Sequence, residues 1–403
     1  MAMQMSFGGF DPAFAMARTT GTAHSNLTAR QASKRLWWSL AFFFISFGVG
    51  TSWDRAWHAT HVFDDFYSPP HLFIYSTFAI SALIFATLAF SPERRAWYGD
   101  DMRVPVLGWQ MPAAIVLAGC GFATIAIAGA LDDVWHTNFG LDETNWSTPH
   151  AMLGWGILLT WSGFLACRHA LRPHIPISRP FIAVAGLITL SLTTSILLGA
   201  LGKDATPDMV RHIAALPPLQ ASSQAQHTFR ILLTWNLTRT NPLFVPAAAA
   251  AAGVALACIR GLTRSTWMFL AVAAVATLFG LTGGHRTASY FHLAGDARNW
   301  LPIPFVAAAI VFVCAKQLRR SDTTSWLLAG LAFSALVASW WGPGPALALL
   351  AAPAMPLGAY AGARLYRAIE HPSAASVRVM AATAVAVPAL LGLLDLYLRW
   401  HTA

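Results

Sequence analysis

Residues 110–136, QMPAAIVLAGCGFATIAIAGALDDVWH, form a long apolar run that ends in two acids, a tryptophan and a histidine. The apolar part, 110–131, carries no charge and has the roughly 20 residues that an α-helix needs to cross a bilayer. Since a backbone in lipid must satisfy its own hydrogen bonds, this run predicts a transmembrane helix. The polar cluster that follows predicts a functional group at the membrane surface.

The whole chain has the composition of a membrane protein. Of its 403 residues, 56% are apolar and 11% are charged, whereas the charged fraction of a soluble domain is normally about 25%. The net charge of +9 comes mostly from short basic runs between apolar stretches, which indicates membrane topology and argues against nucleic-acid binding. The four cysteines stand singly, so disulfides, structural zinc and covalent haem have no support.

Apolar runs of this kind occur about eleven times, which predicts an all-α polytopic transmembrane helical bundle. The predicted spans are 36–53, 71–91, 110–131, 149–168, 179–201, 242–259, 266–283, 301–316, 324–341, 344–363 and 377–398. Every second connection is rich in Arg and Lys, which predicts a cytoplasmic amino terminus in an inner (plasma) membrane of a bacterial cell.

The same pattern divides the chain into three parts. Residues 1–33 are polar and small, and we expect a loose cytoplasmic tail there. Residues 34–175 form a four-span half, and residues 176–403 form an additional transmembrane half with a long outer loop at 202–241.

An internal repeat marks the first half. In 54–71, an Asp-x-x-Trp-His stretch is followed by Ser-Pro-Pro-His at the start of the next span, and 132–150 repeats this order at near-identical spacing with Ser-Thr-Pro-His. Both copies fall in outer connections. Because histidine and aspartate suit copper, iron and zinc, the repeat predicts two metal sites toward the periplasmic or extracellular face.

The spacing indicates which residues bind the metal. An Asp and a His four apart lie on one helical face, and a proline at the opening of the next helix returns a second His toward them. The predicted ligands are Asp54, His58 and His71 in the first copy and Asp132, His136 and His150 in the second. Asp64 and Asp142 would orient an imidazole from outside the ligand set, and Trp57 and Trp135 would screen the sites.

The first copy resembles the copper-ligand segment of the C subunit of copper membrane monooxygenases, the particulate methane and ammonia monooxygenase family. The resemblance covers about residues 36–170 and implies copper at Asp54, His58 and His71. It also implies a second site at Asp132, His136 and His150, where the family has Asn in place of the aspartate. The remaining spans have no counterpart in that family.

Weaker patterns suggest further residues of the same outer cavity. They are Asp208, His212, His227, His285 and His292. The first three lie in the loop 202–241 and echo the repeat with a wider gap, so the loop would bind metal or would be a solvated loop or a substrate lid. His285 and His292 are seven apart and would share a helical face, although helix capping and interfacial anchoring are the simpler roles.

The leading hypothesis is a copper-dependent membrane monooxygenase or related oxidoreductase, with iron or zinc as the alternative metal. It would insert oxygen from O2 into a small or lipophilic substrate and take electrons from an external donor such as quinol, because the sequence has no flavin, haem or nicotinamide motif. Two alternatives stay open: a non-catalytic metal-binding subunit, and a copper or zinc transport or loading protein. Both partner subunits and a homo-oligomer are compatible with this hypothesis.

Overall fold

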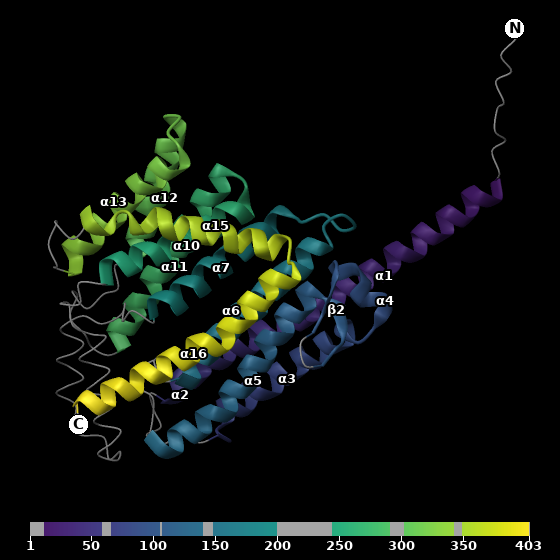
Figure 1. Cartoon of the computed structure of the whole chain (residues 1–403), viewed down its shortest axis with the longest axis horizontal. Helices are drawn as coiled ribbons and strands as arrows, with labels where there is room; N and C mark the ends of the chain where they lie inside the picture. The colour runs from purple at the N-terminus through teal and green to yellow at the C-terminus, as the bar shows by residue number, and fades with distance from the viewer. Residues whose placement is uncertain are drawn as a thin grey trace, which may run out of the picture.

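The computed structural model describes residues 12–58, 66–104, 107–139, 148–199, 244–290, 302–341 and 349–402. Almost all of its elements are helices (Figure 1). One antiparallel pair of short strands, β1 (Asp101–Arg103) and β2 (Gln110–Pro112), is the sheet in the described part of the chain. The predicted all-α class is therefore confirmed.

The first half contains two long helical hairpins. Its elements are α1 (Pro12–Phe44), the π-helix η1 (Ile45–Gly50), α2 (Thr51–His58), α3 (Pro69–Ala89), α4 (Pro92–Arg95), the 3-10 helix η2 (Ala96–Tyr98), α5 (Ala113–Phe139) and α6 (Thr148–Ala170). The second half consists of α7 (Arg179–Gly199), α10 (Phe244–Thr263), α11 (Thr266–Tyr290), α12 (Pro302–Gln317), α13 (Asp322–Trp341), α15 (Ala354–Glu370) and α16 (Ala374–Thr402).

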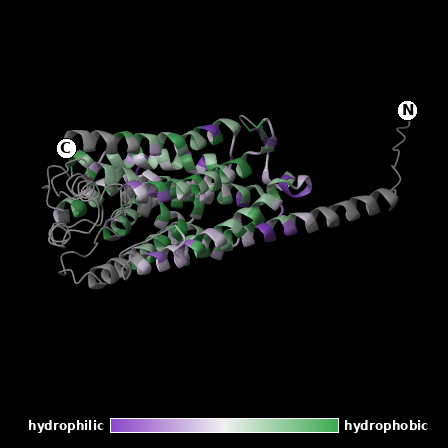
Figure 2. Ribbon diagram, turned by 90° about the horizontal axis from the view of Figure 1, so that it is seen from below, coloured by the Kyte–Doolittle hydropathy of each residue, from purple (hydrophilic) through white to green (hydrophobic). Residues whose placement is uncertain are grey.

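A helix overlaps each predicted apolar run, and hydrophobic residues line these helices along their length (Figure 2). Among the described residues, five helices are long and apolar enough to cross a membrane, and a sixth candidate is the bent pair Leu349–Glu370 and Ala374–Leu390. The chain is thus compatible with a membrane protein. The full count of about eleven spans, which rests on a span length of roughly 20 residues, stays a prediction.

The expected loose tail is in part helical, because α1 begins at Pro12. No proline interrupts the chain between Pro12 and the first span, so the helix continues without a break. Ala29 and Ala32 are buried, and the hydroxyl of the buried Tyr98 donates a hydrogen bond of 3.0 Å to the Ala32 carbonyl. The segment before residue 34 therefore packs against the connection that follows α3.

Tyr98 supplies a test of this packing. Burial raises the pKa of the Tyr98 phenol, so its hydroxyl stays protonated and donates at physiological pH. We expect Tyr98→Phe to lower the free energy of unfolding by about 1 kcal/mol, the net worth of one such hydrogen bond. Titration with SDS in mixed micelles measures this change. Tyr360→Phe is the control and should leave stability nearly unchanged, because the hydrogen bond that its hydroxyl accepts from Arg364 is exposed to solvent. Equal losses in both variants would contradict the docked position of α1.

Phenylalanine rings join the two hairpins of the first half. Phe43 contacts Phe122 and Phe164, and Phe78 contacts Phe122. Within the first hairpin, Ser39 on α1 and Ser81 on α3 exchange hydrogen bonds with each other's backbone carbonyls. These contacts hold the four helices of the first half as one packed unit.

The last helix returns to the first half. The chain bends by 117° between α15 and α16, and Figure 1 shows α16 running beside α5 and α6. The Trp155 indole on α6 donates a hydrogen bond of 2.8 Å to the Thr383 hydroxyl on α16. Val377, Met380 and Ala384 share a buried cluster with Leu117 and Leu159. The last helix of the predicted second half thus packs against helices of the first half.

Candidate metal centre

The first copy of the repeat brings two predicted ligands together. Asp54 lies on α2 and His71 in the first turn of α3, and His71 Nε2 lies 3.2 Å from Asp54 Oδ1. The His71 side chain is only 13% exposed. The two residues come from different helices, so their proximity results from the folding of the hairpin.

The start of α3 explains how His71 reaches this position. Pro69 and Pro70 occupy the first helical turn, where an amide hydrogen would have no intrahelical partner. The Leu72 amide donates to the Ser68 carbonyl at 3.0 Å, which closes the first turn. The predicted Pro-His opening of the helix is therefore confirmed.

A π-helix directly precedes α2, the helix that carries Asp54. The segment Ile45–Gly50 joins α1 to α2, and short π-helical segments are frequent at functional sites. The Ser46 hydroxyl donates to the Ile74 carbonyl at 2.9 Å, and a Cβ on Gly50 would lie 2.5 Å from the Ile74 side chain. The absence of a side chain at Gly50 therefore lets α2 approach α3 and places Asp54 beside His71.

Aromatic rings surround the first pair. The His71 ring stacks on Tyr75 with centroids 5.8 Å apart, and Tyr75 in turn contacts Phe66 at 4.8 Å. Trp53, next to Asp54 in the sequence, packs edge-on against Phe73 at 5.8 Å. Sequence reasoning did not assign Tyr75, Phe66 or Phe73 to the site, although the position of Tyr75 one turn after His71 was a usable signal.

In the second copy, an aspartate and a histidine again lie close together, here on α5 and α6. Asp132 lies near the end of α5 and His150 in the first turn of α6, and His150 Nδ1 lies 3.5 Å from Asp132 Oδ1. The His150 side chain is 30% exposed, more than that of His71. Here α5 continues as an α-helix through Asp132, so this copy has no π-helical segment.

Glycines set the separation of α5 and α6. A Cβ on Gly163 would overlap the backbone of Ala118, and a Cβ on Gly156 would lie 2.7 Å from Ile125. Small residues of this kind let helices in a membrane approach closely. The close approach sets the register that places His150 beside Asp132.

The two pairs lie at the same end of the first half. Phe78 is seven residues from His71, about 10 Å along α3, and Phe122 is ten residues from Asp132, about 15 Å along α5. Because the rings of Phe78 and Phe122 are in contact at 5.5 Å, both hairpins turn at one end of the four helices.

The separation of the ligand atoms suits a shared metal ion. Two ligands at bonds of about 2.1 Å and a tetrahedral angle stand about 3.4 Å apart. The observed separations of 3.2 and 3.5 Å lie on either side of this value. A direct hydrogen bond from imidazole to carboxylate gives a similar separation, so metal content distinguishes the two arrangements.

The third predicted ligand of each copy is placed by its backbone alone. His58 ends α2 one turn beyond Asp54, and His136 lies in α5 one turn beyond Asp132, so each pair shares a helix face. The side chains of His58 and His136 lie outside the described residues. Among the described side chains, no group of three or more His, Cys, Asp or Glu residues could hold a metal.

Some of the other predicted site residues lie in the described part of the chain, and others lie outside it. Trp57 and Trp135 are half-buried and lie three residues after Asp54 and Asp132 on the same helices, and their screening role stays a prediction. The His285 backbone lies in α11, and its side chain is outside the described part. The predicted residues that lie wholly outside the described ranges are Asp64, Asp142, Asp208, His212, His227 and His292.

Comparison with protein-family models, curated proteins and solved structures finds no match for this chain.

Proposed function

We propose that this chain is a membrane-embedded copper-dependent monooxygenase that inserts oxygen from O2 into a small or lipophilic substrate. The observation that carries the proposal is the repeated pairing of a carboxylate with an imidazole, Asp54 with His71 and Asp132 with His150, across two separate helical hairpins. The resemblance of the same residues to the copper segment of the membrane monooxygenases supports copper over iron or zinc.

The protein residues would hold the metal with open positions. Each copy offers one carboxylate and one imidazole in contact, and His58 or His136 one helical turn away. Two imidazoles and one carboxylate leave coordination positions open, as in oxygen-activating sites. Bound copper would supply the activation of O2. The imidazoles would bind it in their neutral form, and the carboxylates would offset part of its charge.

The first copy is the better candidate for the reaction. Its histidine is less exposed than that of the second copy, 13% against 30%. The ring of Tyr75 stacks on it, and Phe66 packs against Tyr75. Exclusion of water protects reactive intermediates and strengthens electrostatic interactions. Exposed apolar side chains, Trp53 and Leu72 among them, flank the pair, which favours a substrate that arrives through the lipid.

The reaction needs electrons from outside the chain. One oxygen atom would enter a C–H or N–H bond of the substrate, and the other would leave as water with two electrons and two protons from a donor such as quinol. Within this proposal the pairs face the periplasmic or extracellular side of an inner membrane. Partner subunits or a second copy of the chain would complete the electron path.

Incorporation of isotopically labelled dioxygen tests the proposal. The protein in lipid nanodiscs would be loaded with copper and given a quinol and a panel of short alkanes, long alkanes and ammonia. We expect labelled product with wild type and at least a tenfold lower yield with His71→Ala. Mutation of a residue that only orients a metal ligand lowers metal affinity or activity roughly 10–100-fold, and loss of the ligand itself should cost at least as much. His371→Ala, an exposed histidine at the end of α15, is the control.

Two outcomes would contradict the proposal in different ways. Copper retention without labelled product from any substrate would favour a non-catalytic metal-binding subunit. If wild type retains no copper, iron or zinc after reconstitution, the metalloenzyme assignment fails. The aspartate and histidine of each pair would then only form a hydrogen bond between two helices.

A further inference from the structure

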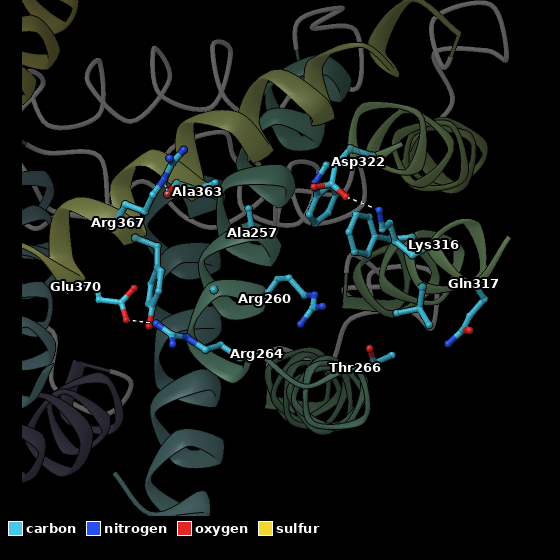
Figure 3. Close-up of a pocket in the computed structure, with 15 residues that line it drawn as sticks. Ala257, Arg260, Arg264, Thr266, Lys316, Gln317, Asp322, Ala363, Arg367 and Glu370 are labelled. Atoms are coloured by element: carbon cyan, nitrogen blue, oxygen red, sulfur yellow. Dashed lines mark hydrogen bonds and ion pairs between the residues drawn. The ribbon is translucent and has the colours of Figure 1, made fainter. Parts of the chain in front are cut away.

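A basic pocket of about 660 Å³ lies in the second half (Figure 3). Its walls are the ends of α10, α12 and α15 and the starts of α11 and α13. It shares no residue with the Asp–His pairs. The basic connections that form its rim belong to the side of the membrane predicted to be cytoplasmic, opposite the pairs.

The pocket holds more positive than negative charge. Four cations, Arg260, Arg264, Lys316 and Arg367, line it together with two acids, Asp322 and Glu370. Arg264 pairs with Glu370, which also forms an ion pair with Arg172 at 3.8 Å, and Lys316 pairs with Asp322 at 2.7 Å. The acids are thus engaged by other cations, and the lining retains an excess of two positive charges.

Arg260 stands between these two ion pairs. Figure 3 shows its guanidinium in the space that separates the Arg264–Glu370 pair from the Lys316–Asp322 pair. The side chain is half-buried, and within the described part of the chain no hydrogen bond or ion pair involves its guanidinium. A half-buried cation without a partner is costly, so this position favours an anion from outside the chain.

The rim of the pocket is typical of the membrane interface. Trp267, directly after the lining residue Thr266, is 82% exposed, and Leu318, directly after Gln317, is 73% exposed. Exposed tryptophans beside basic residues mark the level of the lipid headgroups. The amino terminus of α11 at Thr266 adds a helix dipole that favours negative charge.

We propose that this pocket binds an anionic phosphate group, presented by a lipid headgroup or by a phosphate in solution. Arginine binds phosphate through its planar fork of N–H donors, and basic pockets between transmembrane helices on the cytoplasmic side suit such headgroups. Arg260 and Arg367 supply the charge that the two acids of the pocket do not offset. This inference does not depend on the proposed oxygenase activity.

Native mass spectrometry of the full chain released from nanodiscs tests the proposal. The discs would contain phosphatidylcholine with or without phosphatidylglycerol, and a second arm would add inorganic phosphate to discs of phosphatidylcholine alone. We expect one retained phosphatidylglycerol on wild type and roughly tenfold lower retention with Arg260→Gln, since charge-assisted hydrogen bonds to phosphate are among the strong ones. Arg367→Gln, a second lining cation, should also lower retention and serves if Arg260→Gln does not fold.

The control is Arg364→Gln, which removes an equal charge from α15 outside the pocket and should keep the lipid. Retention that falls only in the pocket variants assigns the site to a headgroup, and retention of inorganic phosphate with the same variant dependence assigns it to a soluble phosphate. Absence of both ligands from wild type would overturn the proposal. Equal losses in Arg260→Gln and Arg364→Gln would also overturn it, because they would indicate general surface charge.

Discussion

Replacement of both Asp54 and Asp132 by alanine is expected to remove nearly all the copper that the wild-type protein retains after reconstitution. Each carboxylate faces the imidazole of its own hairpin, at 3.2 Å in the first copy and 3.5 Å in the second. Loss of the carboxylate removes both a ligand and the negative charge that offsets the cation. We expect affinity at each site to fall by about a hundredfold or more, above the range for outer-sphere partners.

The single variants separate the two copies. Asp54→Ala and Asp132→Ala should each lose about half of the bound copper, because the two pairs belong to different hairpins and share no residue. Asp133→Ala is a close control, since this exposed acid neighbours Asp132 on α5 but points to another face of the helix. Metal content by mass spectrometry gives the readout. If the double variant retains the wild-type content, the carboxylates are not ligands.

Replacement of Gly358 by leucine is expected to prevent assembly of the second half. A Cβ on Gly358 would overlap the Ala250 carbonyl of α10, and a Cβ on Gly362, one turn later, would overlap the Val254 carbonyl. From the α10 side, a Cβ on Gly253 would overlap the Met355 carbonyl. Because backbone atoms cannot move aside as a flexible side chain can, we expect a loss of about 3 kcal/mol or more.

The yield of monodisperse protein and its unfolding midpoint in SDS measure this effect. Gly119→Leu is the matched control, because a Cβ on Gly119, also within an apolar helix, would meet nothing within 4 Å. It should express and unfold like wild type. Equal behaviour of the two variants would mean that α10 and α15 can separate without cost, contrary to their glycine-mediated contact.

The sequence alone predicted the elements of this protein and the pairs of the candidate site. Helices lie at the apolar runs, as expected for segments whose backbone must satisfy its own hydrogen bonds. The pairing of Asp54 with His71, and of Asp132 with His150, followed from local rules: an acid at the end of one helix, and a Pro-His opening of the next. Both rules concern residues that are close in the sequence. A repeated motif was therefore enough to identify the two Asp–His pairs.

Only the tertiary structure decided how these parts combine. The π-helix before Asp54 depends on the approach of Ile74 to Gly50, and the return of α16 to the first half depends on contacts such as that of Trp155 with Thr383. The basic pocket likewise joins residues of five helices between Ala257 and Glu370. Hydropathy and spacing describe one segment at a time, whereas these features arise from packing between segments, where shape and small residues determine which helices meet.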